Sequence, residues 1–341
     1  MRLNALIIGL LFTVSNSFAT TAPVIINGAG ATFPYPIYSK WFSDYHNLHK
    51  AAMINYQSIG SGGGIRQLLD QTVDFGASDA PMTDEQLSKA KSKVLHVPTV
   101  LGAVVLTFNL PELQNKTLKL TGPLIAKIFL GTITKWNDPA LVAVNKGAPL
   151  PNKPILVVHR SDGSGTTAVF SDYLSKVDET WKNEVGAGPA LKWKTGLGGK
   201  GNEGVTGLIK QTPGSIGYTE LTYANTNKLS VATVVNKSGK EIIPSTDTVS
   251  KAAKGYLKDM PADFRISITN SPEKDAYPIS SFTYLLVYEN MGDKAKAKTL
   301  NAFMKWAITT GQKSASHLSY APLPKELIKK IQLQIDKMQL K

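Results

Sequence analysis

Residues 154–170 read PILVVHRSDGSGTTAVF, and this stretch decides the class of fold. The apolar run at its start has the length and composition of a buried β-strand, and the glycines and hydroxyls that follow predict a loop. After the loop, apolar side chains return at helical spacing. They are Val169, Phe170, Tyr173, Leu174 and Val177. A strand that passes through a glycine-rich loop into an amphipathic helix is the repeating unit of α/β proteins.

Strand and helix patterns alternate along the rest of the chain. Residues 103–108 (AVVLTF) and 281–288 (SFTYLLVY) predict two further strands. Helical spacing occurs in residues 65–69, and Pro324 is predicted as the first residue of a C-terminal helix. One face of that helix carries Leu327, Ile328, Ile331, Ile335 and Met338. Because the chain shows no internal repeat and no low-complexity tract, the predicted fold class is α/β.

Two earlier segments share the layout of a strand, a loop of glycines and hydroxyls, and a helix start. They are residues 28–34 (GAGATFP) and 58–64 (SIGSGGG). A helix start leaves backbone N–H groups unpaired and carries partial positive charge, so each loop is a candidate anion site. For a single loop, an ordinary turn with a helix cap is the commoner explanation. The loop after residue 158 is the strongest candidate, because Asp162 can orient Arg160 toward an oxyanion.

The composition limits the classes of function. The 341 residues include 38 Lys and Arg against 25 Asp and Glu, a formal net charge of +13, and no cysteine. At about 150 residues per domain, the length suggests two domains. The lack of cysteine excludes disulfide scaffolds, thiolate metal sites and cysteine nucleophiles. Only four basic residues are Arg and the lysines are scattered, so we expect a solvated surface and no nucleic-acid partner.

The N-terminus has the features of a secretory signal peptide. Residues 1–19 read MRLNALIIGLLFTVSNSFA, with one positive charge at Arg2, an apolar stretch and small residues before the end. The apolar stretch is about half of the roughly 20 residues that a spanning helix needs. We expect cleavage after Ala19 and an exported mature protein with a net charge of +12.

Sequence patterns of catalysis are missing. The five histidines form no metal cluster, neither Ser61 nor Ser164 lies in a nucleophile elbow, and no P-loop is present. Residues 196–201 match G-x-G-x-x-G, but the segment before them is a poor buried strand, so we expect no dinucleotide site. The sequence therefore predicts no enzyme, no metal and no cofactor.

Two other classes of function remain compatible with these residues. A secreted phosphatase or phosphotransferase could use the same oxyanion loops with Ser164 as nucleophile, although no base or metal pattern accompanies it. A polyanion-binding surface protein would use the positive charge itself, and its binding would fall steeply with salt.

Five motifs, in this order, resemble the phosphate-binding proteins of bacterial phosphate ABC transporters. They are residues 28–34, 55–61 (NYQSIGS), 73–81 (VDFGASDAP), 160–166 (RSDGSGT) and 196–202 (GLGGKGN). The resemblance implies a type II periplasmic binding protein fold with two lobes, each a central β-sheet flanked by helices, joined by a two-strand hinge. It also implies a periplasmic, monomeric protein that binds inorganic phosphate with high affinity and delivers it to membrane permease subunits.

On the positions that match, the resemblance implies phosphate ligands from both lobes. Those of the first lobe are Thr32, Phe33, Ser61 and Asp79, and those of the second are Arg160, Ser164, Gly165 and Thr166. Asp162 matches the carboxylate that orients the arginine. We expect lobe I to comprise residues 20–104 and 280–341 and lobe II residues 105–279, with the hinge near 100–108 and 277–284.

Asp79 is the residue that a simple anion site does not explain, because a carboxylate repels an anion. One alternative is a helix cap ahead of Pro81, with a capping box at Thr83 and Gln86. The family interpretation is that the carboxylate accepts the proton that phosphate still carries at neutral pH and sulfate lacks, which favours phosphate. Gly62 stands where the family often has serine, so the second loop has one hydroxyl fewer.

Overall fold

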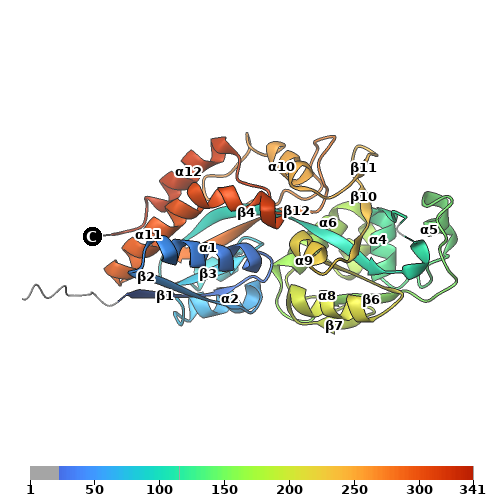
Figure 1. The fold of residues 1–341 in the computed structure, drawn as a ribbon, viewed down its shortest axis with the longest axis horizontal. Coiled ribbons are helices and arrows are strands. Elements are labelled where there is room, and N and C mark those ends of the chain that lie inside the picture. Colours follow the sequence, from blue (N-terminus) through green and yellow to red (C-terminus); the bar gives the residue numbers. More distant parts are fainter. Residues whose placement is uncertain (1–22, 115, 341) are drawn as a thin grey trace, which may run out of the picture.

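The computed structural model describes residues 23–114 and 116–340, so the predicted signal peptide of residues 1–19 lies outside the described residues. Helices and strands alternate along the chain and form two lobes that lie side by side (Figure 1). Within these residues, no helix combines the length and the apolar character needed to cross a membrane.

The elements fall into two groups joined by one long strand, β4 (Val94–Asn109). We refer to the elements before β4 and from β12 onward as lobe I. They are β1 (Val24–Gly30), α1 (Tyr35–Leu48), β2 (Ala52–Ser58), α2 (Ser61–Leu69), β3 (Phe75–Ser78), α3 (Asp84–Ser88), β12 (Ser280–Tyr288), α11 (Lys294–Ala307) and α12 (Lys325–Ile335). We refer to the elements between β4 and β12 as lobe II. They are β5 (Lys119–Thr121), α4 (Gly122–Phe129), α5 (Pro139–Val144), β6 (Leu156–Arg160), α6 (Gly165–Val177), α7 (Glu179–Glu184), β7 (Leu197–Gly199), α8 (Gly201–Gln211), β8 (Ser215–Glu220), α9 (Leu221–Thr226), β9 (Ser230–Val231), β10 (Thr233–Val235), β11 (Glu241–Ile242) and α10 (Thr246–Lys254).

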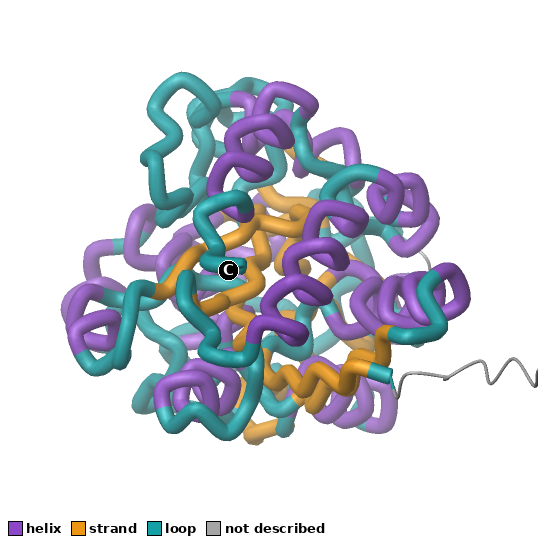
Figure 2. The backbone as a smooth tube through the Cα atoms, turned by 90° about the vertical axis from the view of Figure 1, so that its left-hand side faces the viewer, coloured by secondary structure: helices purple, strands orange, loops and turns teal. Residues whose placement is uncertain are grey.

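A single nine-stranded sheet passes through both lobes. Its order is β2-β1-β3-β12-β4-β8-β6-β7, with β9 also paired to β4. The pairs of β1 with β2 and β3 are parallel, as are those of β6 with β7 and β8. β12 runs antiparallel to β3 and β4, and β4 antiparallel to β8. Helices lie on both sides of the strands (Figure 2), as expected where sheet faces are buried.

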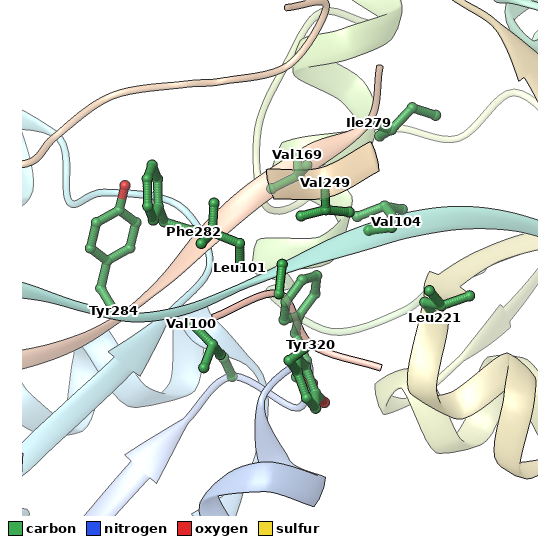
Figure 3. Packing of buried hydrophobic residues seen from close by; sticks show 14 of the residues in the cluster. Val100, Leu101, Val104, Val169, Leu221, Val249, Ile279, Phe282, Tyr284 and Tyr320 are labelled. Carbon is green, nitrogen blue, oxygen red and sulfur yellow. The ribbon is translucent and has the colours of Figure 1, made fainter. Parts of the chain in front are cut away.

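β4 is the strand that both lobes share. It pairs with β12 from Val94 to Ala103 and with β8 from Val104 to Asn109. All of its residues except the last are buried. Figure 3 shows side chains of β4 among others from β12, α6, α9 and α10. The hydrophobic core therefore continues from one lobe into the other along this strand.

Most of the predicted elements are confirmed. The strand predicted at residues 103–108 is the second half of β4, and that at 281–288 is β12. The strand predicted at 154–158 is β6, which starts and ends two residues later. The helical patterns after residues 64 and 164 are α2 and α6.

Two helix starts differ from the prediction. α2 begins at Ser61, so the glycines expected in a loop form its first turn. A Cβ atom on Gly64 would lie 2.4 Å from the Cα of Gly30, so glycine lets this turn pack directly on β1. α12 begins at Lys325, because Pro324 has an extended backbone (ψ 136°) and serves as the N-cap.

Gly102 of β4 links the central strand to the region of the predicted site. A Cβ atom there would lie 2.5 Å from Cζ of the Phe33 ring. We expect Gly102→Ala to lower the free energy of unfolding by about 1–3 kcal/mol through overpacking. Gly207 lies within α8, and its Cβ position has no neighbour within 4 Å, so Gly207→Ala should raise that free energy by about 0.5–1 kcal/mol. Urea unfolding of both variants tests this, and equal stabilities would contradict it.

Candidate functional site

The parallel strands of the two lobes end where the lobes meet. Gly30, the last residue of β1, is in register with Ser58 of β2 and Ala77 of β3. Arg160, the last residue of β6, is in register with Gly199 of β7. The starts of α1, α2, α6 and α8 follow shortly after these strand ends. Ligands of open α/β sheets bind outside the carboxyl ends of the strands, so this edge is the candidate site.

Residues of the two lobes are in direct contact at this edge. The N–H of Gly165 donates to Oγ of Ser61 (3.1 Å), and the N–H of Gly62 donates to the carbonyl of Gly163 (2.9 Å). A Cβ atom on Gly165 would lie 2.4 Å from Oγ of Ser61 and 2.5 Å from Oδ2 of Asp79, so only glycine fits there. A Cβ atom on Gly62 would meet the Cα of Gly163 at 3.1 Å. The glycines therefore allow a close approach of the two lobes.

Three buried backbone N–H groups near this interface have no partner among the described residues. Thr32, Phe33 and Thr166 are buried, and their N–H groups donate to none of the described residues. The carbonyls of Thr32 and Phe33 accept from the hydroxyls of Tyr223 (2.5 Å) and Tyr320 (2.6 Å). These bonds fix the peptide groups on either side of Phe33. Buried N–H groups are nearly always paired, so unpaired ones next to helix starts indicate a place for an anion.

Arg160 supplies the positive charge of the site. Its side chain is 1% exposed, and its Nε and Nη2 donate to the two carboxylate oxygens of Asp162 at 2.8 and 2.6 Å. Nη1 lies on the edge of the guanidinium that Asp162 leaves free. It donates one long hydrogen bond, to Oγ1 of Thr166 (3.4 Å). Partial burial opposes ionisation of Asp162, but the bonds from Arg160 and from the N–H of Gly201 lower the pKa of Asp162. The lowered pKa keeps Asp162 ionised, and its two oxygens hold the guanidinium in one orientation.

Asp79 is a buried carboxyl with one free oxygen. Its Oδ1 accepts from the hydroxyl of Thr283 (2.9 Å), whereas its Oδ2 has no hydrogen-bond partner among the described residues. Burial raises the pKa of Asp79 to about 7, against the opposing effects of the Thr283 bond and the charge of Arg160. The capping box predicted at Thr83 and Gln86 is present at the start of α3, but Asp79 takes no part in it.

Ser164 is the N-cap of α6. Its side chain is fully buried and its Oγ accepts from the N–H of Thr167 (3.0 Å). In the described parts of the chain, no three metal-ligating side chains gather at one place.

The sequence interpretation missed Asn202, the second residue of α8. Asn202 is fully buried, and its side-chain amide donates to the hydroxyls of Thr32 in lobe I and Thr166 in lobe II. The segment before the motif, residues 192–195, forms no strand, as expected. Within the motif, Leu197–Gly199 is the edge strand β7, which brings the start of α8 to the site. The available signal was the match of residues 196–202 to the family, which ends on this asparagine.

Comparisons with known proteins agree on one family. The chain matches the PBP superfamily domain over residues 17–310. It is 46% identical to the phosphate-binding protein PstS of Haemophilus influenzae, over 91% of this chain and 92% of that protein. It is 39% identical to the phosphate-binding protein PstS of Methanocaldococcus jannaschii, over 90% of this chain and 84% of that protein.

Solved structures show the same fold at low sequence identity. A high-affinity periplasmic phosphate-binding protein, PfluDING, bound with phosphate at pH 8.5, matches with a TM-score of 0.72 and 22% identity, over 91% of this chain and 93% of that chain. An ABC-type phosphate transport receptor from Vibrio cholerae matches with a TM-score of 0.58 and 17% identity, over 88% and 100%. The predicted two-lobed periplasmic binding protein fold is thus confirmed. The chain belongs to the PBP superfamily and, within it, to the family of the phosphate-binding proteins PstS.

Proposed function

We propose that this protein binds inorganic phosphate between its two lobes and delivers it to an ABC transporter for import. The observation that carries the proposal is a buried set of anion donors beside the unpaired oxygen of a buried carboxylate. The donors are the unpaired N–H groups of Thr32, Phe33 and Thr166 and the free edge of Arg160. The acceptor is Oδ2 of Asp79. The names of the PstS relatives support the same ligand.

The donors account for affinity in this proposal and the acceptor for selectivity. Hydrogen bonds to a charged group contribute about 1.5–3 kcal/mol each, so a few of them exceed the roughly 8 kcal/mol of a micromolar site after binding entropy is subtracted. Phosphate at neutral pH carries a proton that it can donate to Asp79. Sulfate has no such proton, so it would leave two acceptors facing each other.

The same proposal covers the whole ligand set and its orientation. Phosphate would contact Thr32, Phe33, Ser61 and Asp79 of lobe I and Arg160, Ser164, Gly165 and Thr166 of lobe II. Asp162 would orient Arg160 through the two bonds described above.

We also propose the cellular context and the lobe boundaries implied by the family. Residues 1–19 would be a signal peptide cleaved after Ala19, and the mature protein a periplasmic monomer that meets membrane permease subunits. Lobe I would be residues 20–104 with 280–341, and lobe II residues 105–279. The hinge would lie where β4 changes partner, at Ala103 and Val104, beside Ile279, whose carbonyl accepts from the N–H of Val104 (2.8 Å).

A phosphatase that uses Ser164 is less well supported than a binding protein. The hydroxyl oxygen of Ser164 caps α6, and the relatives are named as binding proteins. Turnover of a chromogenic phosphate ester would favour the enzyme instead.

The proposal is tested by the bound ligand and by direct titration. We expect denaturation of the purified protein to release inorganic phosphate. A sample stripped of ligand should then bind phosphate, and sulfate far more weakly, in calorimetric titrations. A correctly folded protein that binds neither anion would contradict the proposed function.

Arg160→Ala should weaken phosphate binding by about 100-fold or more, because it removes charge-assisted bonds and leaves Asp162 unpaired. Lys298→Ala, an exposed lysine on α11, is the matched control and should change the affinity less than twofold. Calorimetry measures both. Unchanged affinity in Arg160→Ala would remove this residue from the site.

Asp79→Asn should reduce the preference for phosphate over sulfate by about tenfold or more. An asparagine amide keeps the shape and can donate to an oxygen that carries no proton. Competition between the two anions for the stripped variant measures the ratio. Selectivity equal to that of the unmodified protein would contradict the role of Asp79 as the acceptor.

Asp79 should also make the ligand-free protein less stable as the pH rises. Between the ordinary pKa of 3.8 and the folded value of about 7, the folded state binds a proton that the unfolded state has released, so stability falls as pH rises through this window. Asp79→Asn removes this contribution, so the variant should gain stability relative to the unmodified protein on going from pH 5 to pH 8. Urea unfolding without phosphate at both pH values measures it, and a constant difference would contradict the raised pKa.

A further inference from the structure

The amide of Asn202 has only one orientation that satisfies its neighbours. Its Oδ1 accepts from the backbone N–H of Glu220 (3.2 Å) and from the hydroxyl of Thr219 (3.0 Å). A backbone N–H can only donate, so the oxygen of the amide must face Glu220. The nitrogen of the amide therefore faces the opposite side, where the hydroxyls of Thr32 and Thr166 lie.

This orientation fills the acceptor capacity of both hydroxyls. Nδ2 of Asn202 donates to Oγ1 of Thr32 (2.7 Å) and to Oγ1 of Thr166 (3.3 Å). Thr32 accepts a second bond from the backbone N–H of Asn202 (3.2 Å), and Thr166 accepts one from Nη1 of Arg160 (3.4 Å). A hydroxyl oxygen has two lone pairs and one hydrogen, so each threonine keeps only its hydrogen to offer. Neither hydroxyl donates to another group in the described parts of the chain.

We propose that Asn202 is a positioning residue of the anion site, which turns the hydroxyl hydrogens of Thr32 and Thr166 toward the bound anion. The inference rests on the proposed function, because it assigns those hydrogens to phosphate oxygens. Thr32 belongs to lobe I, whereas Asn202 and Thr166 belong to lobe II. The orientation of the Thr32 hydroxyl is therefore set only when the lobes are in contact.

Ser61 shows the same arrangement without help from Asn202. Its Oγ accepts from the N–H groups of Gly165 (3.1 Å) and Asp79 (3.4 Å), so it too keeps only its hydrogen. With these three hydroxyls restricted to donation, Oδ2 of Asp79 is the carboxylate acceptor at the site that has no partner among the described residues. Asn202 thus helps the site to bind a protonated anion more tightly than a fully ionised one.

The test replaces the donor nitrogen of Asn202 by an acceptor oxygen and measures whether the Thr32 hydroxyl still contributes to phosphate affinity. Asn202→Asp keeps the shape but replaces the donor nitrogen by an oxygen, to which the hydroxyls of Thr32 and Thr166 would then donate. We expect phosphate affinity to fall by about 100-fold, through the added charge and the lost donors. Thr32→Val should cost about tenfold in affinity in the unmodified protein and less than about threefold in the Asn202→Asp background.

Ser61→Ala is the matched control, because the Ser61 hydroxyl is set by backbone groups. Its cost should be the same factor in both backgrounds. If Thr32→Val also costs the same factor in both, Asn202 acts through charge or through the fold alone and the inference is overturned. If Asn202→Asp does not fold, as judged by thermal unfolding, Asn202→Ala replaces it in the same cycle. The cost of Thr32→Val in phosphate affinity should then fall by about threefold. Lack of phosphate binding by the unmodified protein would instead contradict the proposed function.

Discussion

The pairing of β4 with strands of both lobes is the constraint on which the rest of the structure depends. One continuous strand binds β12 along its first part and β8 along its last, so the lobes share a sheet and a core. This pairing brings the carboxyl ends of β1, β2 and β3 toward those of β6 and β7. The helix starts that follow supply N–H groups from both sides. A ligand between them would therefore meet groups from both lobes.

The charge of the protein and the charge of its site are separate matters. The net charge of +13 comes from scattered lysines, whereas the site described here uses a single arginine bound to Asp162. A buried ion pair loses much of its hydration, so its value lies in the fixed direction of the guanidinium rather than in added stability. Discrimination between anions then depends on which groups donate and which accept. The scattered lysines can still raise the rate of encounter with anions, an effect that salt weakens.

The sequence predicted the elements whose residues form long, unbroken patterns, such as β12 and α6. It did not predict the first half of β4, because His96, Pro98 and Gly102 interrupt the apolar run. The family motifs indicated most of the candidate site, since those residues follow strand ends in recognisable loops. Asn202 was missed because its role depends on contacts with residues 170 and 36 positions away along the chain. Such contacts have no local pattern.

Pro98 shows how an apparent defect in β4 serves the site. Proline cannot donate within a sheet and is found in central strands at bulges. Here Thr283 of β12 pairs with Val100 and the next residue, Tyr284, pairs with Pro98. Thr99 is therefore the extra residue of a bulge in β4. Bulges redirect side chains beside functional sites. Thr99 donates to the carbonyl of Thr283 (3.1 Å), and the Thr283 hydroxyl donates to Oδ1 of Asp79. Thr283, which lies opposite the bulge and is bonded to it, thus occupies Oδ1 of the carboxyl and leaves Oδ2 as an acceptor.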